Sequence, residues 1–460
     1  MPSRQDQLHS YQYSLQRVVA ALVTHDPDPA RSPLRRAGTT ALVSLLIAAL
    51  AVGGAAIYGL LTGHSNADPT DTAVVFQEKG SGARYVFLDS DKKLHPVLNY
   101  ASGLLLSAGQ APELKSISAD KLASVPLGDP LGIPDAPDSL PDADALLTER
   151  WSVCTDSQRE GTLLVGDKLT DGTVAQQAGE ALLVREPEGR TALVFGNRRY
   201  SIPGDRYTAT LRVLGWADKE PLPVATAWAN AVPLGPTLVG PNVPGAGAGT
   251  SFGDLKVGQV VTGDGQGFAV IMPDGIAPIN EMQAKLMQAA PGGRAPTPIG
   301  GDFVSLPGSK TRLSDSRSPD ALPATVPTLH ATTPARVCMT LPIDAKTGDG
   351  IRIDPTLPQP VVRVQTGQVT SGTVLADYVH IARGKGVVAV AAASPSAPAG
   401  SGTVSVITDT GRSYPLAGRE LLPKLGYGDV KPRQIPSELV TLLPKGPSLD
   451  PARARQTDVP

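Results

Sequence analysis

The two cysteines are the side chains of this 460-residue chain with the widest range of chemistry. Cys154 lies in the run RWSVCT and Cys338 in the run ARVCMT. A thiol in such a chain can act as a nucleophile, bind a metal, fill a small space in a core or form half of a disulfide. A metal site is disfavoured, because no His or second Cys stands at ligand spacing from either residue. The choice among the other roles depends on the compartment and on the segments that carry the cysteines.

Sequence motifs of enzymes and of nucleic-acid-binding proteins are missing. There is no G-x-S-x-G elbow and no H-E-x-x-H pair. The nearest approach to a phosphate loop, GTLLVGDK at residues 161–168, lacks the Gly-Lys-Ser/Thr order and fits a strand with a turn as well. A net charge of −2 offers no basic excess for nucleic acid. The sequence therefore predicts no cofactor, no metal and no nucleic-acid partner, and it favours a protein that is not an enzyme.

A run of 25 uncharged residues, 37–61, is long enough to cross a membrane. At 1.5 Å per residue a helix of this length measures about 37 Å, against about 30 Å for the hydrocarbon core of a bilayer. The alternative is a signal peptide, whose apolar region is usually shorter and closer to the start of the chain. Because 36 residues precede this run, we predict a retained transmembrane helix within residues 37–62.

The charges beside this run predict its orientation. Arg31, Arg35 and Arg36 precede it, whereas residues 62–71 contain no Lys or Arg. By the positive-inside rule, residues 1–36 are expected in the cytoplasm and the bulk of the chain outside it. The expected location is the cell (inner) membrane, crossed once.

An amphipathic helix is expected before the span. Ser3 and Asp6 have the spacing of a capping box, and Pro27 and Pro29 are expected to end the helix. Its apolar residues recur at steps of three and four: Leu8, Tyr11, Leu15, Val18, Val19 and Leu22. A lone helix cannot bury such a stripe, so it must lie on the membrane or dock on a partner. The few basic residues beside the stripe favour a protein partner.

One phrase recurs in the region beyond the span, in forms such as SVPLGDPL, AVPLGPTL and LLPKGPSL. Before each copy lie two short strand-like runs around a tight turn. A helical segment stands between these runs and the phrase. Aligned residues precede the proline of the phrase by 29 to 32 residues in four places, namely Pro96, Ser201, Pro278 and Pro415 before Pro126, Pro233, Pro307 and Pro444. In this alignment His95 takes the place of Tyr200 and Tyr414, which makes it a strand residue and not a catalytic one. The spacing predicts four αβ repeats of about 50 residues.

The uneven placing of these repeats indicates a duplicated half, in which a repeat, an insert and a repeat follow one another. The predicted fold is α+β: a single N-terminal transmembrane helix followed by an elongated extracytoplasmic region, with a β-rich central core and the four repeats in a pseudo-twofold arrangement. The predicted divisions are a cytoplasmic helix with its basic segment (1–36), the span (37–62), a linker with repeat 1 (63–139), a first core segment (140–190), repeat 2 (191–240), a Gly/Pro linker (241–265), repeat 3 (266–308), a second core segment (309–400), repeat 4 (401–447) and a disordered tail (448–460).

This organisation predicts the state of the cysteines. Cys154 lies 28 residues beyond Pro126, and Cys338 lies 31 residues beyond Pro307. Two equivalent positions can face each other across a pseudo-twofold axis, and outside the cytoplasm such thiols are usually oxidised. We therefore expect a disulfide between Cys154 and Cys338, with two separately buried cysteines as the alternative.

The opening SRQDQLHSYQYSLQRVVAAL, the following RSPLRR, the span, the four repeats and the one disulfide together resemble the EccB family of actinobacterial type VII secretion systems. The resemblance covers nearly the whole chain. It implies a structural subunit of an inner-membrane secretion complex beside EccC, EccD and EccE, with EccC as the motor ATPase. Some family members are themselves labelled ATPases, which the motifs of this chain do not support. The repeats are also similar to cell-wall-binding lysin modules, which implies peptidoglycan as a further partner.

Overall fold

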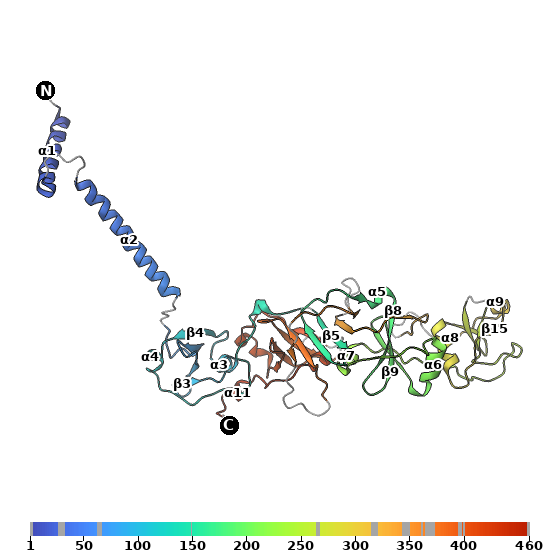
Figure 1. The fold of residues 1–460 in the computed structure, drawn as a ribbon. Helices are drawn as coiled ribbons and strands as arrows, with labels where there is room; N and C mark the ends of the chain where they lie inside the picture. The colour runs from blue at the N-terminus through green and yellow to red at the C-terminus, as the bar shows by residue number, and fades with distance from the viewer. Residues whose placement is uncertain are drawn as a thin grey trace.

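The structure, a computed structural model, describes residues 3–25, 33–61, 67–148, 150–263, 267–313, 321–342, 350–359, 362–363, 373–393, 398 and 401–457. Two N-terminal helices, α1 (Arg4–Thr24) and α2 (Pro33–Leu61), lead to a long body that is rich in short strands (Figure 1). The fold is therefore α+β, with one N-terminal apolar helix and an extended β-rich region, as the sequence predicts.

The two helices follow from local sequence signals. Ser3 caps α1 through a capping box, since its hydroxyl accepts from the Asp6 N–H and the Asp6 carboxylate accepts from the Ser3 N–H. This confirms the predicted cap. The helix ends at Thr24, one residue before His25 takes a left-handed conformation, and Pro27 and Pro29 lie outside the described residues. Within α2, Gly38–Tyr58 is the one segment among the described residues long and apolar enough to cross a membrane.

The centre of the body is a seven-stranded sheet with the order β19-β20-β6-β5-β17-β18-β7. The strands are β5 (Trp151–Asp156), β6 (Gly161–Val165), β7 (Thr173–Val174), β17 (Arg336–Leu341), β18 (Ile351–Ile353), β19 (Val362–Arg363) and β20 (Tyr378–Ile381). At its middle β5 and β17 pair antiparallel, with Cys154 directly opposite Cys338. The pairing joins segments from the two predicted inserts.

Four further sheets share one topology, in which the first three strands form a meander and the fourth returns parallel to the first. We call them lobes 1 to 4. Their strands are β1 (Val74–Glu78), β2 (Arg84–Leu88), β3 (Lys93–Pro96) and β4 (Glu113–Ile117) in lobe 1; β8 (Glu180–Arg185), β9 (Thr191–Phe195), β10 (Arg198–Ile202) and β11 (Leu222–Pro223) in lobe 2; β12 (Val260–Thr262), β13 (Phe268–Met272), β14 (Gly275–Ile279) and β15 (Thr297–Pro298) in lobe 3; and β21 (Gly386–Ala392), β22 (Val404–Thr408), β23 (Ser413–Pro415) and β24 (Arg433–Pro436) in lobe 4. A further strand, β16 (Thr328–Leu329), pairs with β8.

Helical segments occupy the same places in each lobe. Between the third and fourth strands lie α3 (Tyr100–Leu106), α6 (Tyr207–Leu214), α8 (Glu281–Ala289) and, in lobe 4, the short turns η3 (Arg419–Leu421) and η4 (Pro423–Leu425). After the fourth strand lie α4 (Ala119–Leu122), α7 (Thr226–Ala231), α9 (Asp302–Ser305) and α10 (Ser437–Val440). The other short helices are η1 (Ala143–Ala145), α5 (Ala175–Ala178), η2 (Gly204–Arg206) and α11 (Pro451–Ala454).

The recurring Pro-containing phrase covers the open edge of the third strand in every lobe. The proline carbonyl accepts a hydrogen bond from that strand, at 2.8 to 3.0 Å, in the pairs Leu94–Pro126, Arg199–Pro233, Ile276–Pro307 and Ser413–Pro444. Each donor stands two residues before the residue that the sequence alignment places 29 to 32 positions ahead of the proline, namely Pro96, Ser201, Pro278 or Pro415. An edge strand exposes a row of unpaired backbone groups, and the phrase satisfies some of that row. The repeated sequence is therefore a repeated edge cover.

The glycine of the phrase lies against an aromatic ring in three lobes. A Cβ added at Gly128 would lie 2.3 Å from the His95 ring, and one at Gly446 would lie 2.3 Å from the Tyr414 ring. Gly235 stands in the same relation to Tyr200, at 2.7 Å. His95 is buried, and its ring nitrogens contact the Asp129 carbonyl and the Asp91 carboxylate. It thus acts as the ring that packs on the phrase, in agreement with the sequence alignment.

Apolar clusters fix the order of the lobes along the body. One core joins lobe 1 to lobe 4, for example through Val75 and Val406, and another joins lobe 2 to lobe 3 through Leu193 and Met282. The largest cluster surrounds the fully buried Trp228 and joins the central sheet to lobes 2 and 4. The order along the body is therefore lobe 1, lobe 4, central sheet, lobe 2 and lobe 3 (Figure 1).

The predicted segment boundaries remain predictions. In lobes 2, 3 and 4, however, the strands of one sheet come from two neighbouring predicted segments. The first strands of lobes 2, 3 and 4 come from residues that the sequence assigns to the first core segment, to the Gly/Pro linker and to the second core segment. β8 and β21 look like core strands in the sequence because their side chains are buried on both faces, whereas β12 has only three residues and follows a Gly/Pro-rich stretch. β8, for example, is buried at Ala181 through Val184.

The prediction of a disordered tail at 448–460 is wrong for residues 448–457. Leu449 donates its N–H to the Pro415 carbonyl and is fully buried. Asp450 caps α11, and Ala454 packs in the core between lobes 1 and 4. The polar composition of this segment conceals one Leu and one Ala that anchor it.

The glycine packing can be tested with a matched pair. We expect Gly446→Ala to destabilise lobe 4 by about 1–3 kcal/mol, because a methyl group must displace the Tyr414 ring. Gly308→Ala is the control, since no atom lies within 4 Å of its added Cβ. Hydrogen exchange followed by mass spectrometry should quicken in peptides from 404–449 of the first variant and stay unchanged in 268–313 of the second. Equal effects of the two changes would contradict the assigned packing.

The central pairing can be tested through the cysteines. Non-reducing peptide mapping should recover Cys154 and Cys338 in one joined species. The pair closes a stretch of 184 residues, and disulfides typically stabilise by about 2–4 kcal/mol. The double change Cys154→Ala with Cys338→Ala should therefore lower the urea midpoint reported by the fluorescence of the three buried tryptophans, Trp151, Trp216 and Trp228. Free thiols in folded, exported protein would show that this pairing does not form.

Candidate functional site

The predicted docking face of α1 is exposed. Leu8, Tyr11, Leu15, Val18 and Leu22 are 49 to 75% exposed, and Val19 is half-buried. They form one stripe because residues three and four apart share a helix face. A row of large apolar side chains in water is costly, so the stripe is suited to contact with an apolar surface.

The basic residues beside the span are only partly covered by the structure. Arg31 lies outside the described residues. Arg35 and Arg36 belong to the first turn of α2, but their side chains are not among those described. Their proposed role therefore rests on sequence position.

The structure brings Cys154 and Cys338 together in a disulfide, with 1.98 Å between the two sulfur atoms. Both residues are at most 1% exposed and pack with Leu164 and Leu169. Beside them, the buried hydroxyls of Ser152 and Thr340 share a hydrogen bond of 2.8 Å across the same two strands. A bonded and sealed pair offers neither a nucleophile nor a metal ligand, so its role is structural.

Residues 161–168, the weak candidate for a phosphate loop, begin with a strand of the central sheet. Residues 161–165 form β6 between β5 and β20, and the Gly161 N–H donates to the Asp377 carboxylate at 2.6 Å. A phosphate loop needs backbone N–H groups that converge on an open site at a helix start. Here the backbone is paired on both sides. Among the described residues, no group of three or more His, Cys, Asp or Glu side chains could hold a metal ion.

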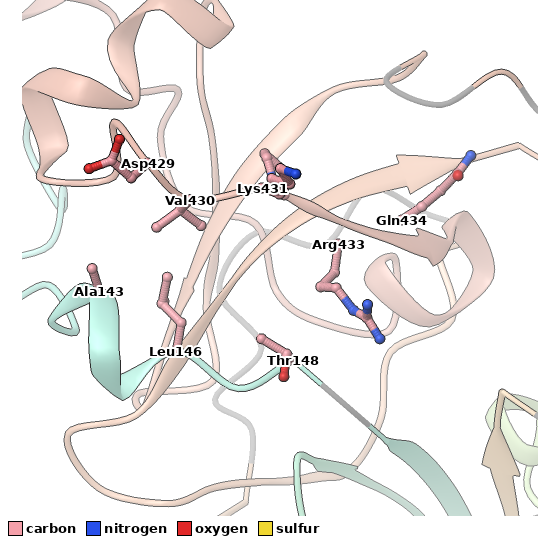
Figure 2. A pocket seen from close by; sticks show the side chains of 9 residues that line it. Ala143, Leu146, Thr148, Asp429, Val430, Lys431, Arg433 and Gln434 are labelled. Carbon is pink, nitrogen blue, oxygen red and sulfur yellow. The ribbon is translucent and has the colours of Figure 1, made fainter.

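An open groove of about 830 Å³ lies where lobe 4 meets the segment that enters the central sheet. Its walls are residues 429–434 on one side and Ala143, Leu146 and Thr148 on the other. In Figure 2, Ala143, Leu146 and Val430 gather at one end, while Thr148 and Arg433 lie at the other. Asp429 lies beside Val430 at the first end, so the groove combines apolar side chains and one carboxylate at one end with a cation at the other.

Two polar contacts hold the segment before residues 429–434 against lobe 1 and against the segment that leads from lobe 1 to the central sheet. The Lys424 ammonium donates to the Ser107 carbonyl at 2.6 Å, and the buried Tyr427 hydroxyl donates to the Pro141 carbonyl at 2.8 Å. Burial raises the pKa of Tyr427, and the nearby Asp142 carboxylate adds to this effect. The hydroxyl therefore keeps its proton, and its hydrogen bond, at any physiological pH.

The sequence did not predict this groove. Its lining comes from residues 143–148 and 429–434, which are almost 300 positions apart. The only local signal was the polar run DVKPRQ, which follows the glycine-rich GYG. Such a run is typical of any exposed turn, so it did not indicate a site.

Comparisons with known proteins agree over the whole chain. Residues 1–459 match the family model of the type VII secretion system ESX-1 transport TM domain B, EccB. The protein named ESX-3 secretion system ATPase EccB3 of Mycobacterium tuberculosis is 26% identical over an alignment of 486 positions with gaps, which covers 97% of this chain and 88% of that protein.

Two solved structures share the fold. The intact ESX-5 inner membrane complex contains a chain with a TM-score of 0.64 and 23% identity, and the match covers 100% of this chain and 96% of that one. The EccB3 dimer from the ESX-3 core complex matches with a TM-score of 0.61 and 23% identity, over 83% of this chain and 100% of that one.

Proposed function

Because this chain belongs to the EccB family, it is a component of a type VII secretion system, and we propose that it acts there as a membrane-anchored scaffold with its bulk outside the cytoplasm. The observation that carries this proposal is the combination of one apolar helix, an exposed amphipathic helix before it and a long multi-lobed body after it. A single-pass anchor of this kind joins events on the two sides of a membrane.

The proposed orientation places α1 in the cytoplasm. Arg35 and Arg36 stand at the start of α2, whereas the ten residues that follow it lack Lys and Arg. This distribution supports a cytoplasmic N-terminus. The buried disulfide of the body supports the same orientation, because disulfides persist outside the reducing cytoplasm.

We further propose that the stripe of α1 docks on neighbouring subunits of the EccC, EccD and EccE type. Its large side chains are exposed in the single chain, and a lone amphipathic helix draws most of its stability from packing its apolar face against another surface. Burial of a Leu or Val side chain contributes about 1.5–3 kcal/mol. Five such residues are thus enough for a stable contact.

The body is proposed to act mechanically and not as an enzyme. Relatives carry the word ATPase in their names. In this chain, the run nearest to a phosphate loop begins with a paired strand of the central sheet, residues 161–165. Two large shared cores and a covalent cross-link at the centre favour a stiff body that holds its ends apart.

The docking role predicts that Leu15→Asp with Val18→Asp reduces recovery of partner subunits on affinity purification at least tenfold. Two carboxylates in the stripe would have to be buried unpaired. The control, His9→Asp with Ser10→Asp, adds the same residues to another side of α1, where both are exposed. Deletion of residues 1–30 should act like the stripe variant. A complex that survives this deletion intact would rule out docking through α1.

The scaffold role predicts no ATP hydrolysis by the purified protein above the rate of a mock preparation. Lys168→Ala, which removes the lysine of the 161–168 run, should leave any residual rate unchanged. Hydrolysis that copurifies with the protein through a second column and falls in the Lys168 variant would instead establish an enzyme.

A further inference from the structure

The groove of lobe 4 has a counterpart in lobe 2. Along β21, Leu146 stands opposite Gly386, and Arg433 stands opposite Ala389. Along β8, Leu329 stands opposite Ala181, and Leu222 stands opposite Val184. On each strand the two positions that face these neighbours are three residues apart, Gly386 and Ala389 on β21 and Ala181 and Val184 on β8. The groove in lobe 4 and the hollow in lobe 2 are therefore the same place in the two halves of the body.

One hydrogen bond confirms the correspondence. The Leu147 N–H donates to the Gly386 carbonyl at 2.7 Å, and the His330 N–H donates to the Ala181 carbonyl at 2.8 Å. Leu147 thus matches His330. The segments GYGDVKPRQ and GWADKEPLP line the two places in the same order, so that Arg433 matches Leu222 and Lys431 matches Glu220.

In lobe 2, side chains fill most of the equivalent hollow. Leu222 is 8% exposed, and the His330 ring lies 2.6 Å from the Glu180 carboxylate across the strands. The hollow that remains measures about 140 Å³. In lobe 4, Arg433 stands in place of Leu222 and Leu147 in place of His330. Arg433 is exposed, and Leu147 cannot form an ion pair, so neither side chain fills the groove. The lobe 4 copy remains open at about 830 Å³.

The two copies also differ in charge. With His neutral, the lining of the lobe 2 hollow has a net charge of −1, from Asp218, Lys219 and Glu220. The lining of the lobe 4 groove has a net charge of +1, from Asp429, Lys431 and Arg433. Arg433 is the first residue of the edge strand β24, and Lys431 lies two residues before it. Both side chains are exposed. The same wall carries Asp429 at the far end from Arg433, so the excess positive charge lies towards Lys431 and Arg433 and favours an anionic group there.

The groove continues towards lobe 1. An adjoining hollow of about 250 Å³ shares Ala143, Asp429 and Val430 with it. Its walls carry little side-chain bulk, because Gly426, Gly428 and Ala111 are among them. Together the two hollows form a trough with room for main chain at one end. Leu146 and Val430 follow, with the Asp429 carboxylate beside Val430, and the cations Lys431 and Arg433 lie towards the other end. This sequence of surfaces fits an extended peptide better than a compact small molecule.

We propose that this trough binds an extended acidic segment of a partner protein. Carboxylates of the segment pair with Lys431 and Arg433, where a guanidinium can donate two parallel hydrogen bonds to a carboxylate. An apolar side chain of the segment packs between Leu146 and Val430. The site does not depend on docking through α1, which lies at the other end of the anchor.

Full-length protein in detergent micelles provides the test. The probe is a fluorescently labelled decapeptide of alternating Glu and Val, and its anisotropy is followed at about 50 mM salt. We expect saturable binding that weakens at least tenfold at about 300 mM salt. Lys431→Glu with Arg433→Glu should weaken binding at least tenfold, and should allow a Lys-Val peptide to bind in its place. Arg433→Leu, which installs the lobe 2 residue, should weaken the acidic peptide by a smaller factor.

Two controls separate this site from general electrostatics. Lys256→Glu with Arg312→Glu makes the same charge change on two exposed residues of lobe 3 and should leave binding unaltered. A uronic-acid oligosaccharide of equal charge should not compete with the peptide, because it lacks the apolar group for Leu146 and Val430. The proposal fails if peptide binding is absent, if the lobe 3 variant weakens it as much as the groove variant, or if the oligosaccharide takes the groove in preference.

Discussion

The pairing of β5 with β17 is the constraint on which the rest of the body depends. It brings together strands from the two inserts and places Cys154 directly against Cys338. One face of the pair carries the disulfide with Leu164, and the other carries Trp151, Val153 and Met339 against α7. Because each insert leads into a lobe whose first strand lies next to this core, the register of the pair also sets the positions of lobes 2 and 4. Loss of that register would separate the cores of the two halves.

The lobes solve a second problem, which is the exposed edge of a small sheet. In a four-stranded sheet of this topology the third strand lies at an edge and is open to pairing with other chains. The Pro-Gly phrase covers this edge with its own carbonyl and N–H groups, and the glycine lets the chain lie flat on a ring of the strand. The same device serves all four lobes, although lobe 3 lacks the ring contact. This explains why the phrase persists while the surrounding sequence varies.

The N-terminal helices follow a different logic from that of the body. Helix α2 exposes its apolar side chains almost entirely, and α1 exposes a single stripe. Neither arrangement is stable in water, so both helices presuppose an environment that the chain alone does not supply. For α2 this is the bilayer, and for α1 it is the proposed contact with partner subunits. The body, in contrast, buries its own cores and leaves polar grooves at the surface, among them the lobe 4 groove beside Arg433.

The sequence by itself determined the local and periodic features. The capping box of α1, the apolar span, the spacing of the phrase and the fold class all depend on residues that are near one another or that recur at fixed steps. The partners of long-range contacts were decided only by the tertiary structure. The first strand of each later lobe looked like core or linker, since burial on both faces hides its sheet partner. The anchor of the C-terminal segment rests on Leu449 and Ala454, two residues that composition does not single out. The lobe 4 groove, likewise, exists only because residues 143–148 and 429–434 meet across the fold, and no local pattern encodes a meeting of that kind.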